Sequence, residues 1–170
     1  MSSGGLDTGI RVLLAEDHAL VRAGIDRLLS AAGIEVVGHA ANGFEAIAAA
    51  ATLRPDVVIM DLSMPELDGI VATREIVAAN PETRVLVLTS FSDQERIVEV
   101  FDAGAVGYLL KDADPEELTK AVRAVSRGEM PLDPRAARML LGGGARNRPN
   151  TDLTDREQEV LELVATGRSN

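Results

Sequence analysis

The sequence contains no cysteine and no tryptophan, and only 2% of its residues are aromatic. Without cysteine, the chain cannot form disulfides, thiolate metal sites or a cysteine nucleophile. Two histidines, His18 and His39, are too few for a histidine-rich metal site. No apolar run approaches the roughly 20 residues that cross a bilayer, and residues 1–9 lack the regions of a signal peptide. We therefore expect a cytoplasmic protein with a loose tail at 1–9 and no membrane contact.

The 170 residues do contain enough apolar material for a core, because 46% are hydrophobic and 26% are charged. Since aromatics are scarce, Ala, Val, Leu and Ile must fill this core, which suits helices packed on a parallel sheet. The net charge of −10 disfavours non-specific binding of nucleic acid, because phosphates would be repelled. Any DNA contact must come from a locally basic part of the protein.

Short apolar runs rich in branched residues alternate with amphipathic segments five times. Two helix starts carry clear signals: Asn42 with Glu45 three residues later, and Asp114 followed by Pro115. This alternation predicts an α/β fold, a doubly wound five-stranded parallel sheet with helices on both faces, in the flavodoxin-like order. The expected strands are 10–15, 35–40, 56–60, 84–88 and 106–110, and the expected helices are about 20–32, 43–54, 70–79, 93–103 and 115–127.

The composition changes after Gly128, where proline and glycine become frequent. Residues 129–152 are therefore predicted to be a linker, with a possible short helix at 134–141 capped by Asp133.

A further unit is predicted at 153–170, where Thr154 and Glu157 form a capping box ahead of an apolar stripe. One helix cannot bury its apolar stripe alone, so this segment is expected to be the incomplete start of an all-α domain. The expected organisation is a tail at 1–9, a sheet domain at 10–128, the linker at 129–152 and the truncated helical segment at 153–170.

Polar residues directly follow four of the predicted strands. They are Glu16, Asp17, Asp61, Thr89 and Lys111. In a doubly wound sheet, ligands bind beyond the carboxyl ends of the strands, so these side chains are expected to converge. Three neighbouring carboxylates repel one another, and a hard cation such as Mg²⁺ would relieve this. The other interpretation is that they are ordinary polar residues at the solvent border, but five at matching strand ends favour a site.

These five residues fit phosphoryl transfer. In that reaction one carboxylate attacks phosphorus, while Mg²⁺ and a lysine stabilise the charge on the phosphoryl oxygens. Asp61 is the natural nucleophile, because it stands alone at its strand end before an open loop with Pro65 and Gly69.

At these residues the sequence resembles response-regulator receivers of the NarL/LuxR type. The resemblance covers about 10–128 and rests on segments that include LLAEDHALVRAGI (13–25), DVVIMDLSMPELDGI (56–70), VLVLTSF (85–91) and GAVGYLLKDADPEELTKAVRAVSRGE (104–129). A second segment, LTDREQEVLELVATGRSN (153–170), is similar to the opening of a LuxR-type helix-turn-helix domain.

The resemblance implies a response regulator of a two-component system that accepts a phosphoryl group from a histidine kinase. The kinase would dock near residues 19–24. Phosphorylation would promote formation of a homodimer. It would also switch the activity of a DNA-binding domain that regulates transcription. The implied roles are Asp61 as phosphoacceptor, Glu16, Asp17, Asp61 and the Ser63 backbone carbonyl as Mg²⁺ ligands, Lys111 and Thr89 as phosphoryl-contacting residues, and Thr89 with Tyr108 as the switch pair.

Two departures matter. Asp112 follows the lysine where many receivers have proline, and the recognition helix that would enter the major groove is missing from the sequence. We therefore expect promoter DNA to be bound only by a full-length protein, with no DNA-binding residues in this chain.

Two other function classes are weighed against this one. Aspartate-nucleophile phosphatases resemble it but carry Asp-x-Asp, whereas position 63 is Ser, so a turnover enzyme is not expected. A receiver-like interaction module that is never phosphorylated would usually lack an acid or the lysine, and both are present.

Tyr108 has two interpretations, a switch or a half-buried strand residue. His18 is expected to start a helix, His39 to lie on a strand surface, and Met60 and Met64 to serve packing.

Overall fold

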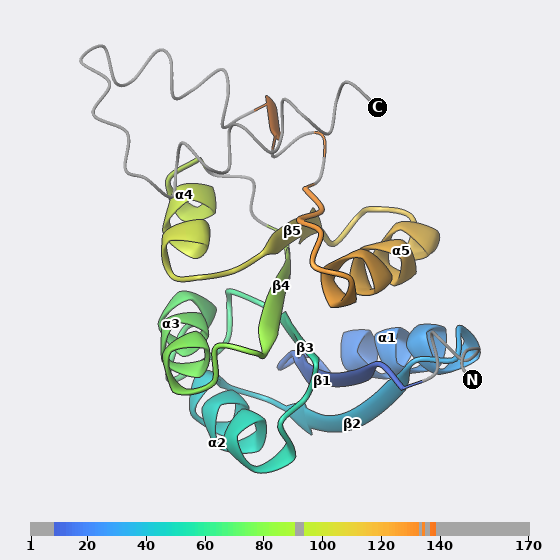
Figure 1. The fold of residues 1–170 in the computed structure, drawn as a ribbon, viewed down its shortest axis with the longest axis horizontal. Helices are drawn as coiled ribbons and strands as arrows, with labels where there is room; N and C mark the ends of the chain where they lie inside the picture. The colour runs from blue at the N-terminus through green and yellow to red at the C-terminus, as the bar shows by residue number, and fades with distance from the viewer. Residues whose placement is uncertain (1–8, 91–93, 133, 135–136, 139–170) are drawn as a thin grey trace.

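The computed structural model describes residues 9–90, 94–132, 134 and 137–138, in which strands and helices alternate along the chain (Figure 1). The elements are β1 (Arg11–Ala15), α1 (Ala19–Ala31), β2 (Glu35–Ala40), α2 (Gly43–Leu53), β3 (Val57–Met60), α3 (Gly69–Ala79), β4 (Arg84–Thr89), α4 (Gln94–Asp102), β5 (Gly107–Leu110) and α5 (Pro115–Ser126).

The strands form one parallel sheet in the order β2-β1-β3-β4-β5. Helices α1 and α5 cover one face, and α2, α3 and α4 cover the other (Figure 1). This is the flavodoxin-like order, so the predicted fold class is confirmed. The chain reverses its direction of winding between β1 and β3, which opens a crevice at the carboxyl ends of these strands.

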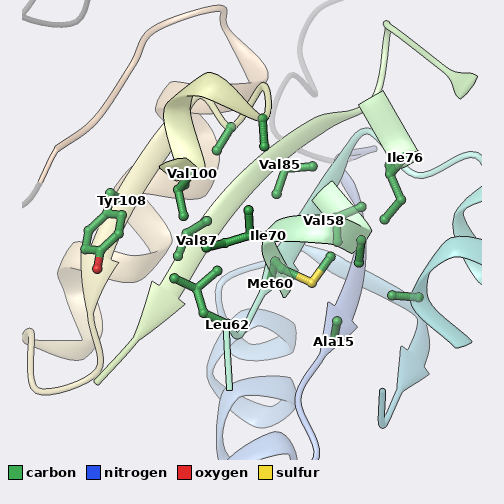
Figure 2. Packing of buried hydrophobic residues seen from close by; sticks show 14 of the residues in the cluster. Ala15, Val58, Met60, Leu62, Ile70, Ile76, Val85, Val87, Val100 and Tyr108 are labelled. Carbon is green, nitrogen blue, oxygen red and sulfur yellow. The ribbon is translucent and has the colours of Figure 1, made fainter. Parts of the chain in front are cut away.

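The sheet is buried on both faces, as expected for central parallel strands. Alternate side chains of each strand enter two separate apolar clusters. From β1, Leu13 faces the cluster under α2–α4, and Val12 and Leu14 face the aliphatic cluster under α1 and α5. Figure 2 shows the first of these clusters, with Met60 inside it and Tyr108 at its β5 end.

The predicted helix starts are confirmed in position, but they differ in chemistry. The Asn42 side chain accepts a hydrogen bond from the Glu45 amide at 2.8 Å, and Glu45 Oε1 accepts one from the Ala41 amide at 2.8 Å. Asp114 occupies the N-cap of α5 with Pro115 behind it, yet within the described residues its side chain makes no capping bond. Asp114 is therefore the N-cap residue as predicted, and the fixed φ of Pro115 favours the helix start.

Most element boundaries agree with the sequence to within two residues. Strand β3 begins at Val57 rather than Asp56, and β5 at Gly107 rather than Val106. Within the described residues, no helix is long and apolar enough to cross a membrane. The predicted cytoplasmic location stays a prediction. Residues 1–8, most of the predicted helix at 134–141 with its cap Asp133, and the segment 153–170 lie outside the described residues.

Candidate functional site

The carboxyl ends of β1, β3, β4 and β5 meet at one edge of the sheet and bring the predicted polar residues together. The parallel register fixes this, because Ala15 pairs with Met60 and Thr89 pairs with Leu110. The next backbone bonds extend the same ladder, since the Asp61 amide donates to Ala15 and the Lys111 amide donates to Thr89.

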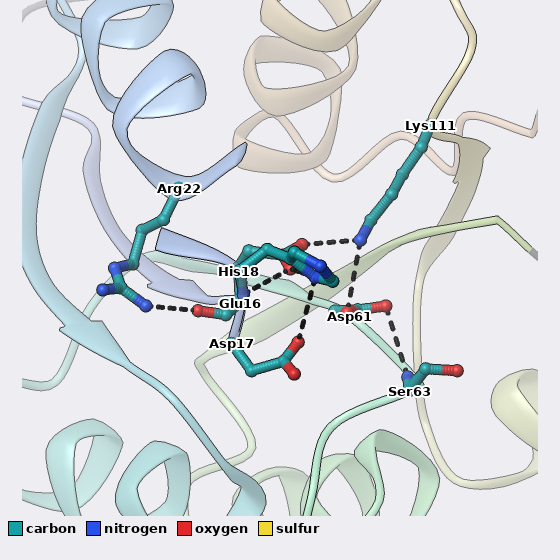
Figure 3. Close-up of polar contacts among 7 residues, drawn as sticks. All are labelled: Glu16, Asp17, His18, Arg22, Asp61, Ser63 and Lys111. Atoms are coloured by element: carbon teal, nitrogen blue, oxygen red, sulfur yellow. Dashed lines mark hydrogen bonds and ion pairs between the residues drawn. The ribbon is translucent and has the colours of Figure 1, made fainter. Parts of the chain in front are cut away.

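Lys111 lies between two buried carboxylates (Figure 3). Its Nζ is 2.7 Å from Glu16 Oε1 and 3.2 Å from Asp61 Oδ2. The side chains of Glu16 and Asp61 are only 2% and 4% exposed, so one ammonium partly compensates two desolvated negative charges. The cluster keeps a net negative charge, which favours a further cation.

The two neighbouring carboxylates also change the pKa of Lys111. Partial burial acts to lower the pKa of the Lys111 ammonium. The hydrogen bond to Glu16 and the charges of Asp61 and Glu16 outweigh this, so the pKa is raised above its ordinary value of 10.5. Lys111 is therefore a fixed positive charge at any pH near neutrality.

Asp61 is held at the end of β3 by its own loop. Its Oδ1 accepts a hydrogen bond from the Ser63 amide at 3.2 Å, while Oδ2 faces Lys111 (Figure 3). The start of α3 packs directly on this turn, because a Cβ at Gly69 would collide with the backbone carbonyl of Asp61. Glycine at 69 is therefore required for the helix to approach the candidate nucleophile this closely.

Two hydrogen bonds to Glu16, one of them from a side chain of α1, hold the turn between β1 and α1. Arg22 Nη1 donates to the backbone carbonyl of Glu16 at 2.6 Å, and the His18 amide donates to Glu16 Oε2 at 3.0 Å (Figure 3). His18 is the N-cap residue of α1, so its prediction as a helix-start residue is confirmed. The role of Arg22 was not predicted from the sequence, because a side chain that reaches six residues back to a backbone carbonyl has no sequence signature.

Three neighbouring residues offer donor atoms for a cation. Atoms of Glu16, Asp17 and His18 lie within 4.8 Å of one another, and among the described residues Asp61 is not part of that group. Asp17 is the more open acid, with a side chain that is 29% exposed, whereas Glu16 is turned toward Lys111. Two carboxylates beside a third at Asp61 form an oxygen-rich donor set, which fits a hard cation such as Mg²⁺.

The predicted switch residues lie inside the protein. Thr89 and Tyr108 are both 0% exposed, so the interpretation of Tyr108 as a half-buried residue is wrong. The Tyr108 ring packs beside Phe101, with ring centroids 6.5 Å apart and planes tilted by 33°. Met60 and Met64 are buried in the same cluster, which confirms their packing role.

Comparison with known proteins gives one consistent family. The family described as response regulator receiver domain matches residues 12–123. The transcriptional regulatory protein LiaR of Bacillus subtilis is 42% identical over 166 residues, covering 95% of this chain and 79% of LiaR.

Solved structures agree with this match. A LuxR-family two-component response regulator from Aurantimonas sp. SI85-9A1 aligns with a TM-score of 0.75 at 36% identity, covering 78% of this chain and 96% of that one. The isolated REC domain of RcsB from Salmonella enterica serovar Typhimurium, with the phosphomimetic BeF3-, aligns with a TM-score of 0.70 at 30% identity, covering 76% and 97%. The chain therefore belongs to the response regulators of two-component systems, and the domain built around this site is a receiver domain.

Proposed function

We propose that Asp61 accepts a phosphoryl group from a histidine kinase, and that this changes dimerisation and the activity of a C-terminal DNA-binding domain. The observation that carries the proposal is the placement of Lys111 between Glu16 and Asp61 at the sheet edge. A buried, net negative cluster with one fixed ammonium is costly to stability, and such clusters occur where chemistry requires them.

The chemistry follows from the side chains. An Asp61 carboxylate oxygen attacks phosphorus and forms an O–P bond. The P–N bond to the donor imidazole breaks, and the imidazole nitrogen keeps the electron pair. Lys111 is 3.2 Å from Asp61 Oδ2 and can neutralise charge on the transferred oxygens without leaving the site. The Ser63 amide, already 3.2 Å from Oδ1, orients the carboxylate.

Glu16, Asp17, Asp61 and the Ser63 carbonyl are the groups we assign to Mg²⁺. Bound there, the cation would supply positive charge to the phosphoryl oxygens. Glu16 also positions Lys111, so we infer that its carboxylate serves both partners, whereas the more open Asp17 is dedicated to the cation.

The proposal that phosphorylation controls a DNA-binding domain is supported by the names of similar proteins. LiaR is named a transcriptional regulatory protein, and the Aurantimonas protein is named a member of the LuxR family. We propose that phosphorylation adds charge beside Thr89, which draws the end of β4 toward Asp61 and alters the packing of Tyr108. Homodimerisation and promoter binding by a full-length protein would then follow.

The test is intact-mass measurement after incubation with Mg²⁺ and acetyl phosphate. We expect one phosphoryl adduct on the wild type and none on Asp61→Asn. Asp56→Asn is the matched control, because Asp56 is an exposed carboxylate just before the start of the same strand and accepts a hydrogen bond from the Arg11 amide. That variant should be labelled like the wild type.

Stoichiometric labelling of Asp61→Asn would contradict the assignment of the acceptor. If the wild type takes no adduct from acetyl phosphate or from a phosphorylated histidine kinase, the alternative of an unphosphorylated interaction module gains support. Sustained release of phosphate from a phosphoester substrate would instead indicate a turnover enzyme.

A further inference from the structure

The first backbone carbonyl beyond β1 is held by a side chain of α1. The hydrogen-bond ladder of β1 reaches the sheet edge, where the Asp61 amide donates to the carbonyl of Ala15 and the Glu16 amide donates to the carbonyl of Ala40. The next carbonyl, that of Glu16, accepts a hydrogen bond from Arg22 Nη1 at 2.6 Å (Figure 3). Because Glu16 is only 1% exposed, water has little access to replace the guanidinium at this carbonyl.

The bond from Arg22 completes the set of partners around Glu16. The amide of Glu16 bonds to Ala40 at 2.9 Å, and its carbonyl bonds to Arg22. Its carboxylate accepts from the Lys111 ammonium at 2.7 Å and from the His18 amide at 3.0 Å. These partners come from β2, α1, the residue after β5 and the turn itself. The main chain of Glu16 is therefore held in one orientation, and Arg22 fixes its carbonyl end.

Asp17, the next residue, receives its orientation through this peptide. Its side chain is 29% exposed, and its Oδ1 lies 3.9 Å from His18 Nδ1, which is too long for a hydrogen bond. A peptide unit is planar, so a bond to the Glu16 carbonyl also fixes the plane that carries the nitrogen and Cα of Asp17. The direction of the Asp17 carboxylate depends on this plane. Arg22 thus acts on Asp17 through the backbone.

We propose that Arg22 is a positioning residue of the cation site: its bond to the Glu16 carbonyl holds the Asp17 carboxylate where Mg²⁺ binds. The inference rests on the proposed function, which assigns Asp17 to the cation. Partners that orient a metal ligand from outside typically change metal affinity by about 10–100-fold when they are removed. The guanidinium donates to a backbone oxygen, so it acts by orienting a ligand and not by binding the cation.

Charge and positioning predict opposite effects of Arg22 on the cation. The guanidinium is a positive charge next to an acidic cluster, so by charge alone its removal would strengthen Mg²⁺ binding. If Arg22 positions Asp17, its removal weakens Mg²⁺ binding in spite of the lost repulsion. A third role, in which Arg22 only stabilises the start of α1, would lower the free energy of unfolding and leave Mg²⁺ affinity unchanged.

A Mg²⁺ titration of the full chain distinguishes these roles, followed by the NMR shift of the Ser63 amide, which bonds to Asp61 Oδ1. We expect Arg22→Gln to raise the dissociation constant of Mg²⁺ about tenfold. Arg27→Gln is the matched control, because it removes the same charge from an exposed position of α1. Its dissociation constant should equal that of the wild type or be slightly lower. A dissociation constant of Arg22→Gln no higher than that of Arg27→Gln would overturn the proposal.

A measurement on the wild type needs no variant to fold. Coupling between two equilibria is reciprocal, so if the bond from Arg22 favours Mg²⁺ binding, Mg²⁺ must favour the bond by the same factor. We expect saturating Mg²⁺ to slow hydrogen exchange of the Arg22 guanidinium by up to about tenfold, with the Arg27 guanidinium unchanged. Faster exchange at Arg22 would show that repulsion between the two cations dominates. Faster or unchanged exchange would contradict the positioning role.

Labelling by acetyl phosphate separates this inference from the proposed function. At saturating Mg²⁺, Arg22→Gln should take the phosphoryl adduct as fast as the wild type, and at low Mg²⁺ it should be slower. Slow labelling at saturating Mg²⁺ would mean that Arg22 does not act through the cation. An adduct on the wild type with unchanged Mg²⁺ affinity in Arg22→Gln would overturn the inference and leave the proposed function standing. Weakened Mg²⁺ binding without an adduct on the wild type would do the reverse, and an unshifted Ser63 amide in the wild type would count against both.

Discussion

Two sets of polar contacts tie separate elements of this protein together, and they lie in different surroundings. In the first, Lys111 joins Glu16 and Asp61, whose side chains are 2% and 4% exposed. In the second, His39 Nε2 on β2 lies 2.6 Å from Asp26 Oδ2 on α1, with side chains 45% and 33% exposed. The second contact is the shorter one, yet we expect it to matter less, because water screens both of its partners.

We expect burial, more than distance, to decide how much each of these contacts contributes to stability. The exposed pair can lose either partner, because water solvates the other. The buried cluster cannot, because a carboxylate left without a cation keeps its desolvation cost. The same property makes the buried cluster suited to chemistry, since its charges act on one another at low dielectric constant.

The largest expected effect comes from Lys111→Met, which leaves Glu16 and Asp61 buried without a cation. Breaking a fully buried pair costs about 3–5 kcal/mol, and the partial exposure of this site reduces that to about 2 kcal/mol. We expect the free energy of unfolding in urea to fall by this amount in metal-free buffer. Added Mg²⁺ should restore part of it, because the unpaired carboxylates bind the cation more strongly.

The control for this change is Lys120→Met, on the exposed side of α5. We expect it to alter the free energy of unfolding by less than about 0.5 kcal/mol, as surface substitutions usually do. Equal effects of the two substitutions would show that the buried cluster has no special weight.

The fold could be predicted from the sequence because its determinants are local. Apolar runs such as the one at 56–60, Gly and Pro at the element ends, and polar residues at matching strand ends each signal one element or edge. Parallel topology then brings Glu16, Asp61, Thr89 and Lys111 to one place without further information. Those four residues lie at the strand ends where they were predicted.

What could not be predicted depends on contacts between distant residues. The packing of Pro131 and Leu132 on β5 joins a proline-rich segment to a strand more than twenty residues before it, and composition indicated only a linker. Tyr108 is fully buried in the cluster against which Leu132 packs. Arg22 was missed for the same reason, since its partner is a backbone carbonyl with no residue identity to detect.

A smaller effect is expected from pH, because the pKa of Lys111 is raised in the folded protein. The stabilisation that the ammonium provides is fully present below the ordinary pKa of 10.5, and it is lost as pH rises through the higher folded value. The difference in unfolding free energy between wild type and Lys111→Met should therefore be constant near neutrality and shrink at alkaline pH. A difference that grew with alkaline pH would have the wrong sign for this explanation.

The smallest effect is expected at the exposed pair. His39→Gln should lower the free energy of unfolding by about 0.5 kcal/mol or less, because a solvent-exposed polar contact contributes little. Asp26→Asn should cost a similar amount, and the double variant should cost little more than either single one, which a urea-unfolding double-mutant cycle measures. High salt should remove most of the coupling, since screening acts on exposed charges. A coupling of about 2 kcal/mol that persisted in high salt would mean that the 2.6 Å contact, rather than its exposure, governs its energy.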